Sequence, residues 1–296
     1  MEYIPAKHLV LRSKSTGWFG CGYTMNIYRG CNHGCIYCDS MSECYGIDDF
    51  GTVRAKQNAL AIIGDDLRRK VRKGIIGTGA MSDPYNSFER DLNLTANALQ
   101  LIDAYQFGVA IDTKSDLIVR DIPALQMIQT HSPVLCKVTV TTMDDALAAK
   151  IEPGAPSPTR RMEAVRKLSA AGLFTGVLLM PVLPFLEDTE ENVLAVTQAA
   201  AAAGAKFVYP AFGMTTRDRQ RETYLTRLDQ LFPQQQYRQK YEKSFPNRYQ
   251  CTSPNARRLW TVFSAACRDL GLLYDMRHIT AAYQRGYGDL QMSFFE

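Results

Sequence analysis

Short apolar segments and longer amphipathic segments alternate between residues 24 and 212 of this chain, and this alternation constrains its fold more than any other feature. Apolar segments such as GVAID (108–112) and CKVTVTT (136–142) are near-continuous runs, typical of parallel strands buried on both faces. The segments between them have the apolar spacing of helices. The expected strands are 24–28, 74–79, 108–112, 136–142, 175–182 and 206–212, and the expected helices are 55–73, 92–106, 121–130, 159–172 and 189–203.

Strands that alternate with helices in this way predict an α/β fold with a parallel sheet. Because no glycine-rich dinucleotide-binding loop is present, we expect a barrel or an incomplete barrel over residues 1–212 rather than a Rossmann sheet. From residue 213 the sequence becomes polar, basic and helical in pattern, with a further helix expected near 254–270. Residues 213–296 are therefore expected to form a mainly helical extension packed on the barrel.

The extension carries the positive charge of the chain. It has 13 Lys and Arg residues against 8 Asp and Glu residues, whereas the whole chain has a net charge of +4. The arginine-rich segment TTRDRQRETYLTR (215–227) includes a tyrosine, a pattern that suits either a nucleic-acid contact or a solvated helix face. The sequence has no apolar run of about 18 residues and no secretory h-region, so we expect a cytoplasmic protein without a membrane span.

Three cysteines lie within eight positions in YRGCNHGCIYCDS (28–40), directly after the first expected strand. In a cytoplasmic chain, clustered cysteines are expected to bind a metal or to be redox-active, not to form disulfides. The CxxxCxxC spacing lacks a second zinc knuckle, although Cys44 or His33 could supply a fourth ligand. Three thiolates from one loop also suit a 4Fe-4S cluster that keeps one iron open.

This loop resembles the cluster loop of the radical S-adenosylmethionine (SAM) enzymes, with Tyr37 as the aromatic residue before the last cysteine. The resemblance implies a partial (βα)6 TIM-type barrel, with a 4Fe-4S cluster held by Cys31, Cys35 and Cys38. It implies that SAM binds the open iron and is cleaved to a 5′-deoxyadenosyl radical. It also implies an external electron donor, such as a reductase or a flavodoxin-type protein. Gly30 would let the loop approach the cluster closely.

Four segments extend the resemblance, over roughly residues 5–212, to the spore photoproduct lyase-like branch. They are NIYRGCNHGCIYCD (26–39), GTGAMSDPYNSFER (77–90), DTKSDLIVRDIPAL (112–125) and LLMPVLPFLEDTEENV (178–193). In this branch Ser82 and Asp83 would contribute to the SAM pocket, and Lys114 would bind the SAM carboxylate. The alternatives are a turn at Ser-Asp-Pro and a solvated lysine at a strand end.

The strand CKVTVTT offers two further candidates. Lys137, Thr139 and Thr141 point to one side of this strand, because side chains alternate along a strand. If that side faces the barrel interior, Thr139 or Thr141 could reach the SAM ribose or the substrate; equally, threonine is simply a good strand former.

Two residues depart from the pattern of the true spore photoproduct lyases. Met81 stands where those enzymes have a hydrogen-donating cysteine, and Asp39 stands where a tyrosine follows the last cluster cysteine. Methionine has no S–H to donate, so repair of the spore photoproduct itself is in doubt. Cys44 and Cys136 are alternative donors, but each also suits a structural role. The histidines form no nucleophile constellation.

The sequence DLQMSFFE (289–296) resembles the peptide by which bacterial DNA repair and replication proteins dock on the sliding clamp. Its candidate anchors would fill an apolar groove on the clamp, and the alternative is that this segment folds back onto the barrel. The candidate clamp-binding residues are Gln291, Met292, Ser293, Phe294 and Phe295.

These features lead to one main functional hypothesis and two alternatives. The main one is a radical SAM enzyme, lyase-like, that acts on nucleic acid in DNA lesion repair or modification. The second keeps the radical chemistry but acts on a peptide or a small molecule. The third is a non-catalytic nucleic-acid-binding protein stabilised by a metal.

Overall fold

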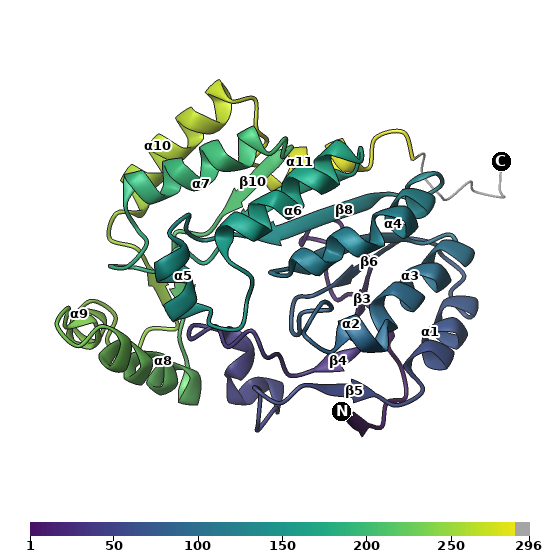
Figure 1. Ribbon diagram of the computed structural model, residues 1–296, viewed down its shortest axis with the longest axis horizontal. Helices are drawn as coiled ribbons and strands as arrows, with labels where there is room; N and C mark the ends of the chain where they lie inside the picture. Colours follow the sequence, from purple (N-terminus) through teal and green to yellow (C-terminus); the bar gives the residue numbers. More distant parts are fainter. Residues whose placement is uncertain (288–296) are drawn as a thin grey trace.

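A seven-stranded sheet forms the centre of the computed structural model, which describes residues 1–287 (Figure 1). Six of its strands are parallel, and only β2 runs antiparallel to its neighbour β3. In spatial order the strands are β10 (Phe207–Pro210), β9 (Phe174–Leu179), β8 (Val134–Thr139), β7 (Gly108–Thr113), β6 (Ile75–Thr78), β3 (Tyr23–Met25) and β2 (Val10–Arg12).

Helices cover the outer face of this sheet, as Figure 1 shows for α1, α3, α4 and α6. All residues of β7 and β8 are buried, because these strands lie between the helices and the barrel interior. The covering helices are α1 (Ala59–Arg68), α3 (Leu94–Ala104), α4 (Ile122–Gln129), α6 (Pro158–Ala170) and α7 (Glu190–Ala202). The expected α/β partial barrel is therefore confirmed.

Shorter elements connect these units. The predicted helix 55–73 is wrong at its start, because residues 54–56 form a strand instead, and the predicted strand 24–28 is split between two sheets. A three-stranded sheet consists of β1 (Glu2–Ile4), β5 (Arg54–Lys56) and β4 (Tyr28–Arg29). The short helices are α2 (Glu89–Leu92) and α5 (Asp145–Ile151), and the 3₁₀ helices are η1 (Asp39–Met41), η2 (Glu43–Tyr45) and η3 (Asp116–Asp121).

The segment after residue 212 packs on the barrel at two places. Near the carboxyl ends of the barrel strands, β11 (Gly213–Thr215) pairs antiparallel with β12 (Gln250–Thr252). Two helices lie between these strands in the sequence, and the pair is called the β11–β12 hairpin below. The helix that follows β12 packs on α7. At the opposite end, Leu273 bridges to Phe207 of β10. The helices of this segment are α8 (Asp218–Leu231), α9 (Tyr237–Ser244), α10 (Ala256–Asp269) and α11 (Met276–Tyr283). A division of the chain near residue 212 stays a prediction.

Aromatic side chains close the barrel at the amino-terminal ends of its strands. Phe19, from the loop between β2 and β3, and Tyr283 of α11 are buried in one apolar cluster with Leu135 and Phe207. A Cβ atom at residue 176 would lie 2.3 Å from the Phe207 ring, so Gly176 leaves room for this ring. The accessible mouth is thus at the carboxyl ends of the strands.

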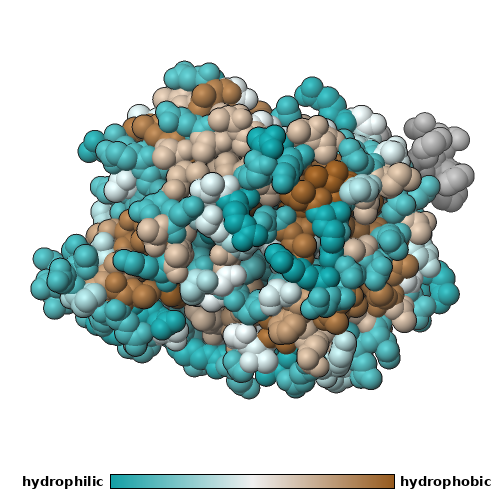
Figure 2. Space-filling model, in the orientation of Figure 1, coloured by the Kyte–Doolittle hydropathy of each residue, from teal (hydrophilic) through white to brown (hydrophobic). Residues whose placement is uncertain are grey.

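On the face seen in Figure 2, hydrophilic residues predominate and apolar residues form separate small patches.

Candidate active site

The three clustered cysteines line one cavity of about 110 Å³ at the carboxyl ends of the parallel strands. Residues from the ends of β6, β7 and β8 complete its wall, as expected for ligand sites in barrels of this kind. The lining residues are Cys31, His33, Cys35, Cys38, Ser40, Gly79, Ala80, Met81, Asp83, Asp112, Thr113, Lys114 and Thr139. The structure thereby brings Asp83, Lys114 and Thr139 to the cysteine loop.

The cysteine loop is held in shape by its own backbone. Gly30 has a φ of 83°, and a Cβ atom there would lie 2.3 Å from the Thr52 carbonyl oxygen. The amide of Cys31 donates to the Phe50 carbonyl at 2.8 Å, and the amide of Ile36 donates to the Ile151 carbonyl at 2.9 Å. The loop is therefore anchored at both ends before any metal binds.

The donor set fits a 4Fe-4S cluster better than a single zinc ion. Among residues 1–287, no three His, Cys, Asp or Glu side chains come close enough to hold one metal ion. A 4Fe-4S cluster does not require its thiolates to converge on one ion, because each thiolate binds a different iron. Burial raises the pKa of the Cys31 thiol to about 12 and that of Cys35 well above its ordinary value, so a bound metal is needed to keep these groups as thiolates.

A buried cluster of four charged or polar side chains lies beside the thiols. Both carboxylate oxygens of Glu152 are occupied, one by the Tyr37 hydroxyl and the other by the Arg161 guanidinium, and the Lys114 ammonium lies 3.9 Å from Glu152. Lys114 also lies 5.4 Å from the centre of the Tyr37 ring. Burial would raise the pKa of Glu152, but Arg161 and Lys114 hold it below its ordinary value. This cluster fixes Lys114 and Tyr37 relative to the cysteine loop.

Glu152 and Arg161 were not identified from the sequence. One signal was available: Arg161 lies on the apolar face of α6, with the buried Val165 and Leu168 one and two turns later. A charged residue at such a position needs a buried partner.

Asp83 connects the cysteine loop to the end of β7. Its carboxylate accepts hydrogen bonds from the Thr113 hydroxyl and the Lys114 amide, both at 2.7 Å, and from the Tyr85 amide at 2.9 Å. His33 Nε2 lies 3.0 Å from the same carboxylate. Burial opposes the charge of Asp83, but His33 and these hydrogen bonds keep its pKa below the ordinary value. Ser82, by contrast, lines a neighbouring cavity and not the one that contains the cysteines.

Of the polar residues on β8 and in the loop after it, one faces the cysteine cavity and two are buried against carboxylates. Thr139 lines the cysteine cavity, whereas the Thr141 hydroxyl donates to Glu187 at 2.7 Å and is buried. Lys137 is fully buried, with its ammonium 2.8 Å from Asp112 Oδ1. Burial raises the pKa of Glu187 to about 8. Glu187 and Asp112 were also not identified from the sequence.

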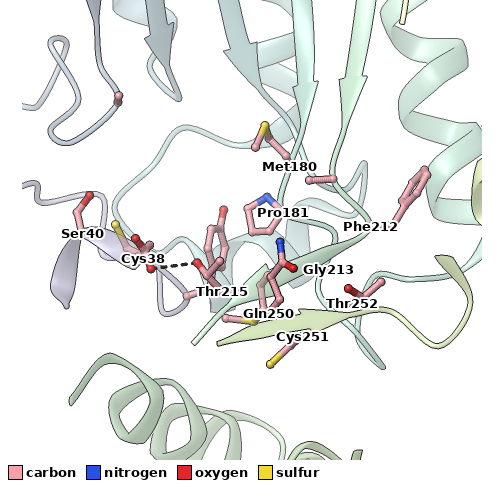
Figure 3. Close-up of a pocket in the computed structure, with 15 residues that line it drawn as sticks. Cys38, Ser40, Met180, Pro181, Phe212, Gly213, Thr215, Gln250, Cys251 and Thr252 are labelled. Carbon is pink, nitrogen blue, oxygen red and sulfur yellow. Dashed lines mark hydrogen bonds between the residues drawn. The ribbon is translucent and has the colours of Figure 1, made fainter. Parts of the chain in front are cut away.

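A second, larger cavity of about 510 Å³ lies between the cysteine loop and the β11–β12 hairpin (Figure 3). Its wall includes Cys38, so it adjoins the cluster site. In Figure 3 the Gln250 side chain extends toward Pro181, across the cavity from Met180. The lining residues are Tyr37, Cys38, Asp39, Ser40, Ala80, Met180, Pro181, Ala211, Phe212, Gly213, Met214, Thr215, Gln250, Cys251 and Thr252.

Asp39 joins the two walls of this larger cavity. Its carboxylate accepts a hydrogen bond from Thr215 at 3.0 Å, drawn as the dashed line in Figure 3, and pairs with the Arg217 guanidinium at 2.6 Å. The Tyr45 hydroxyl donates to the same carboxylate at 2.9 Å. The residue that departs from the family pattern therefore ties the cysteine loop to the segment after residue 212.

No described cysteine other than a predicted cluster ligand directs its thiol into either cavity. Met81 lines the cysteine cavity, Cys44 is exposed, and Cys136 is buried on the outer side of β8. Cys251 belongs to the wall of the larger cavity, but its sulfur points away from Pro181 in Figure 3 and lies 3.3 Å from the Thr216 hydroxyl.

Two other predictions concern clamp binding and the membrane. The candidate clamp-binding residues Gln291, Met292, Phe294 and Phe295 lie outside the described residues. None of the helices in residues 1–287 combines the length and the apolar character needed to cross a bilayer.

Comparison with known proteins identifies the family. Residues 25–197 match the radical SAM superfamily. An uncharacterized protein of Mycobacterium tuberculosis strain H37Rv is 32% identical over 230 residues, which are 75% of this chain and 67% of that protein. One from Methanocaldococcus jannaschii is 32% identical over 174 residues, 58% of this chain and 64% of that protein. A structure of spore photoproduct lyase complexed with dinucleoside spore photoproduct has a TM-score of 0.66 at 15% identity, covering 91% of this chain and 80% of that one, and so shares its fold. This chain belongs to the radical SAM superfamily, whose enzymes use a 4Fe-4S cluster and SAM.

Proposed function

We propose that this radical SAM enzyme acts on nucleic acid, in the repair or modification of a DNA lesion. Cys31, Cys35 and Cys38 would hold the cluster, and Lys114 and Thr139 would contact SAM from the same cavity. When it is bound and reduced, the cluster with SAM supplies a carbon-centred radical that abstracts a hydrogen atom. The observation that carries the proposal is the larger cavity, because it adjoins Cys38 and has room for a nucleotide.

The size and the lining of this cavity support a nucleotide substrate. Its volume of about 510 Å³ lies in the range of small-molecule sites, about 300–1,000 Å³. The side chains of Met180 and Phe212 offer apolar contacts, and Gln250 and Thr252 offer groups that can hydrogen-bond to the edge of a base. The enzyme of similar fold was solved with a dinucleoside lesion, and the positive charge of residues 213–296 favours an anionic polymer.

The reaction we propose differs from one in which a protein thiol returns a hydrogen atom to the product. Met81 carries no S–H, and none of the described thiols outside the predicted cluster ligands points into either cavity. Asp83 and Tyr37 would position Lys114 through the contacts described above. Ser82 lines the neighbouring cavity and Thr141 binds Glu187, so neither is proposed to touch SAM.

The test is formation of 5′-deoxyadenosine by the anaerobically reconstituted, reduced enzyme with SAM. We expect the rate to rise when UV-irradiated DNA is added and to rise less with undamaged DNA. A Gln250→Ala variant should lose most of this stimulation and keep the rate without DNA, because Gln250 lines the larger cavity and not the one that contains the three clustered cysteines.

If neither DNA sample changes the rate of 5′-deoxyadenosine formation, the proposed nucleic-acid substrate is contradicted. This result would leave the radical chemistry intact and favour a peptide or small-molecule substrate in the same cavity.

Two partner proposals accompany this function. A reductase or a flavodoxin-type protein would supply the electron, and the segment around Gln291–Phe295 would bind the sliding clamp. A Gln291→Ala/Phe295→Ala variant should lose binding to purified clamp in a pull-down while its reconstituted activity stays unchanged. Equal clamp binding by this variant and the unaltered protein would reject the motif.

A further inference from the structure

The side chain of Arg217 contacts two tyrosines, next to Asp39 and Gln250, which line the larger cavity. The guanidinium carbon of Arg217 lies 5.4 Å from the centre of the Tyr45 ring and 5.0 Å from that of the Tyr249 ring. Tyr249 directly precedes Gln250, whose side chain enters the cavity. Tyr45 belongs to η2, shortly after the cysteine loop, so this group spans both walls of the site.

The surrounding structure orients Arg217 and holds the backbone at Arg248 and Tyr249. The Thr216 amide donates to the Tyr249 carbonyl at 2.8 Å, and the Thr216 hydroxyl donates to the Arg248 carbonyl at 3.1 Å. The ion pair with Asp39 at 2.6 Å sets the orientation of the Arg217 guanidinium. The backbone at Tyr249 is thus held by Thr216, and one face of its ring lies against a cation that Asp39 orients.

Tyr249 makes no contribution to an apolar core that would explain this arrangement. It is 48% exposed, and among residues 1–287 it belongs to none of the buried apolar clusters. The neighbouring Arg248 is exposed, and its guanidinium has no ion-pair or hydrogen-bond partner within the described part of the chain. An exposed aromatic ring that lies against one arginine and beside a second, unpaired one is a combination that suits single-stranded nucleic acid.

We propose that Tyr249, supported by Arg217, is a stacking platform for a DNA base that flanks the nucleotide in the larger cavity, and that Arg248 binds a phosphate of the same strand. The proposal rests on the proposed function, since it assumes a nucleic-acid substrate. A base would stack on the ring irrespective of its sequence, because every base has a π-face. The platform would position the strand, while the groups inside the cavity would select the lesion.

The experiment measures binding of a fluorescein-labelled single-stranded DNA dodecamer to the reconstituted enzyme by fluorescence anisotropy, without reductant. We expect Tyr249→Ala to raise Kd about 5- to 150-fold, the range measured for single base–aromatic stacks. Tyr249→Phe keeps the ring and should bind within about twofold of the unaltered enzyme. Trp260→Ala is the matched control, because Trp260 is 47% exposed on α10 and lies outside both cavities.

The phosphate contact has a readout of its own. Arg248→Gln should reduce the slope of log Kd against log salt concentration by about one, whereas Tyr249→Ala should leave that slope unchanged. Equal Kd values for Tyr249→Ala and the unaltered enzyme would overturn the platform and leave the nucleic-acid function standing. Absence of DNA binding by the unaltered enzyme would overturn both.

Discussion

The two walls of the active-site mouth place their polar groups in opposite environments. On the barrel wall, Glu152, Arg161 and Asp83 are almost completely buried, and each makes several hydrogen bonds or ion pairs within the protein. On the wall contributed by β11 and β12, Gln250 is exposed, and so are Arg248 and Tyr249, which directly precede β12. A buried charge is tolerated only with its partners in place, so the barrel wall has one geometry. The hairpin wall leaves its groups free for a ligand.

This difference suggests a division of labour. A cofactor that is the same in every turnover suits a wall whose contacts are complete before it binds. The proposed substrate, part of a long polymer, would suit a wall whose backbone is hydrogen-bonded and whose side chains have no partners within the protein. The larger cavity lies where the two walls meet, at Cys38 and Asp39.

The largest effect is expected in the cysteine loop beside the barrel wall, from loss of a proposed cluster ligand. Cys35→Ala should lower iron content and reduce 5′-deoxyadenosine formation to background, because two thiolates cannot hold a site-differentiated 4Fe-4S cluster in this loop. Iron analysis, the absorbance spectrum and product formation check this. Cys44→Ser is the control, since Cys44 is exposed and does not line the cysteine cavity. Full activity of Cys35→Ala would remove the cluster assignment.

The second prediction concerns the buried ion pair behind Lys114. Arg161→Met leaves the Glu152 carboxylate without its main partner, and we expect a loss of about 3–5 kcal/mol in the free energy of unfolding. This corresponds to a fall in Tm of roughly 5–8 °C for a chain of this size. Calorimetry of the protein without its cluster measures the effect independently of activity.

Two further variants test this reasoning. Arg161→Met/Glu152→Gln should recover more than half of the loss, because it removes the unpaired charge. Arg166→Met on the same helix breaks an exposed pair with Glu163 and should leave the free energy of unfolding unchanged within the error of the measurement. A similar loss for Arg161→Met and Arg166→Met would show that the barrel wall does not depend on buried charge.

The third prediction is a pH dependence that originates in Glu187. Burial raises its pKa to about 8 in the folded protein, from an ordinary value of 4.5. Between these values the folded state keeps a proton that the unfolded state releases. Stability should therefore fall as the pH rises from about 5 to 8, by at most about 1.4 kcal/mol per pH unit.

Urea unfolding at intervals from pH 5 to pH 8 measures this slope. Glu187→Gln should make it shallower, whereas Glu163→Gln, at an exposed position on α6, should leave it unchanged. Identical slopes for Glu187→Gln and the unaltered protein would assign the dependence to other groups.

The sequence was a good guide where the chemistry is local and a poor one where partners are distant. The continuous apolar strands and the spacing of Cys31, Cys35 and Cys38 predicted the fold class and the site of the loop. Glu152 and Arg161 were not predicted as site residues, because a charged residue is expected at the surface unless a buried partner is known. The pairing of β11 with β12 was not predicted either. Each strand has only three residues, too few for a detectable period, and the two lie more than 30 positions apart.

The smallest expected effect tests the junction of the two walls. Asp39→Asn keeps the shape of the side chain and its hydrogen bond from Thr215 but removes the charge that orients Arg217. Because both members of this ion pair are partly exposed, we expect a loss of only about 1 kcal/mol. The loss should be local: amide exchange should accelerate in residues 213–217, which the hairpin holds, and stay unchanged in β7. Measured by hydrogen–deuterium exchange, equal rates in Asp39→Asn and the unaltered protein would mean that the hairpin keeps its place without this link. The barrel wall would then be independent of the hairpin wall, and Asp39 would be a departure from the family pattern without a structural consequence.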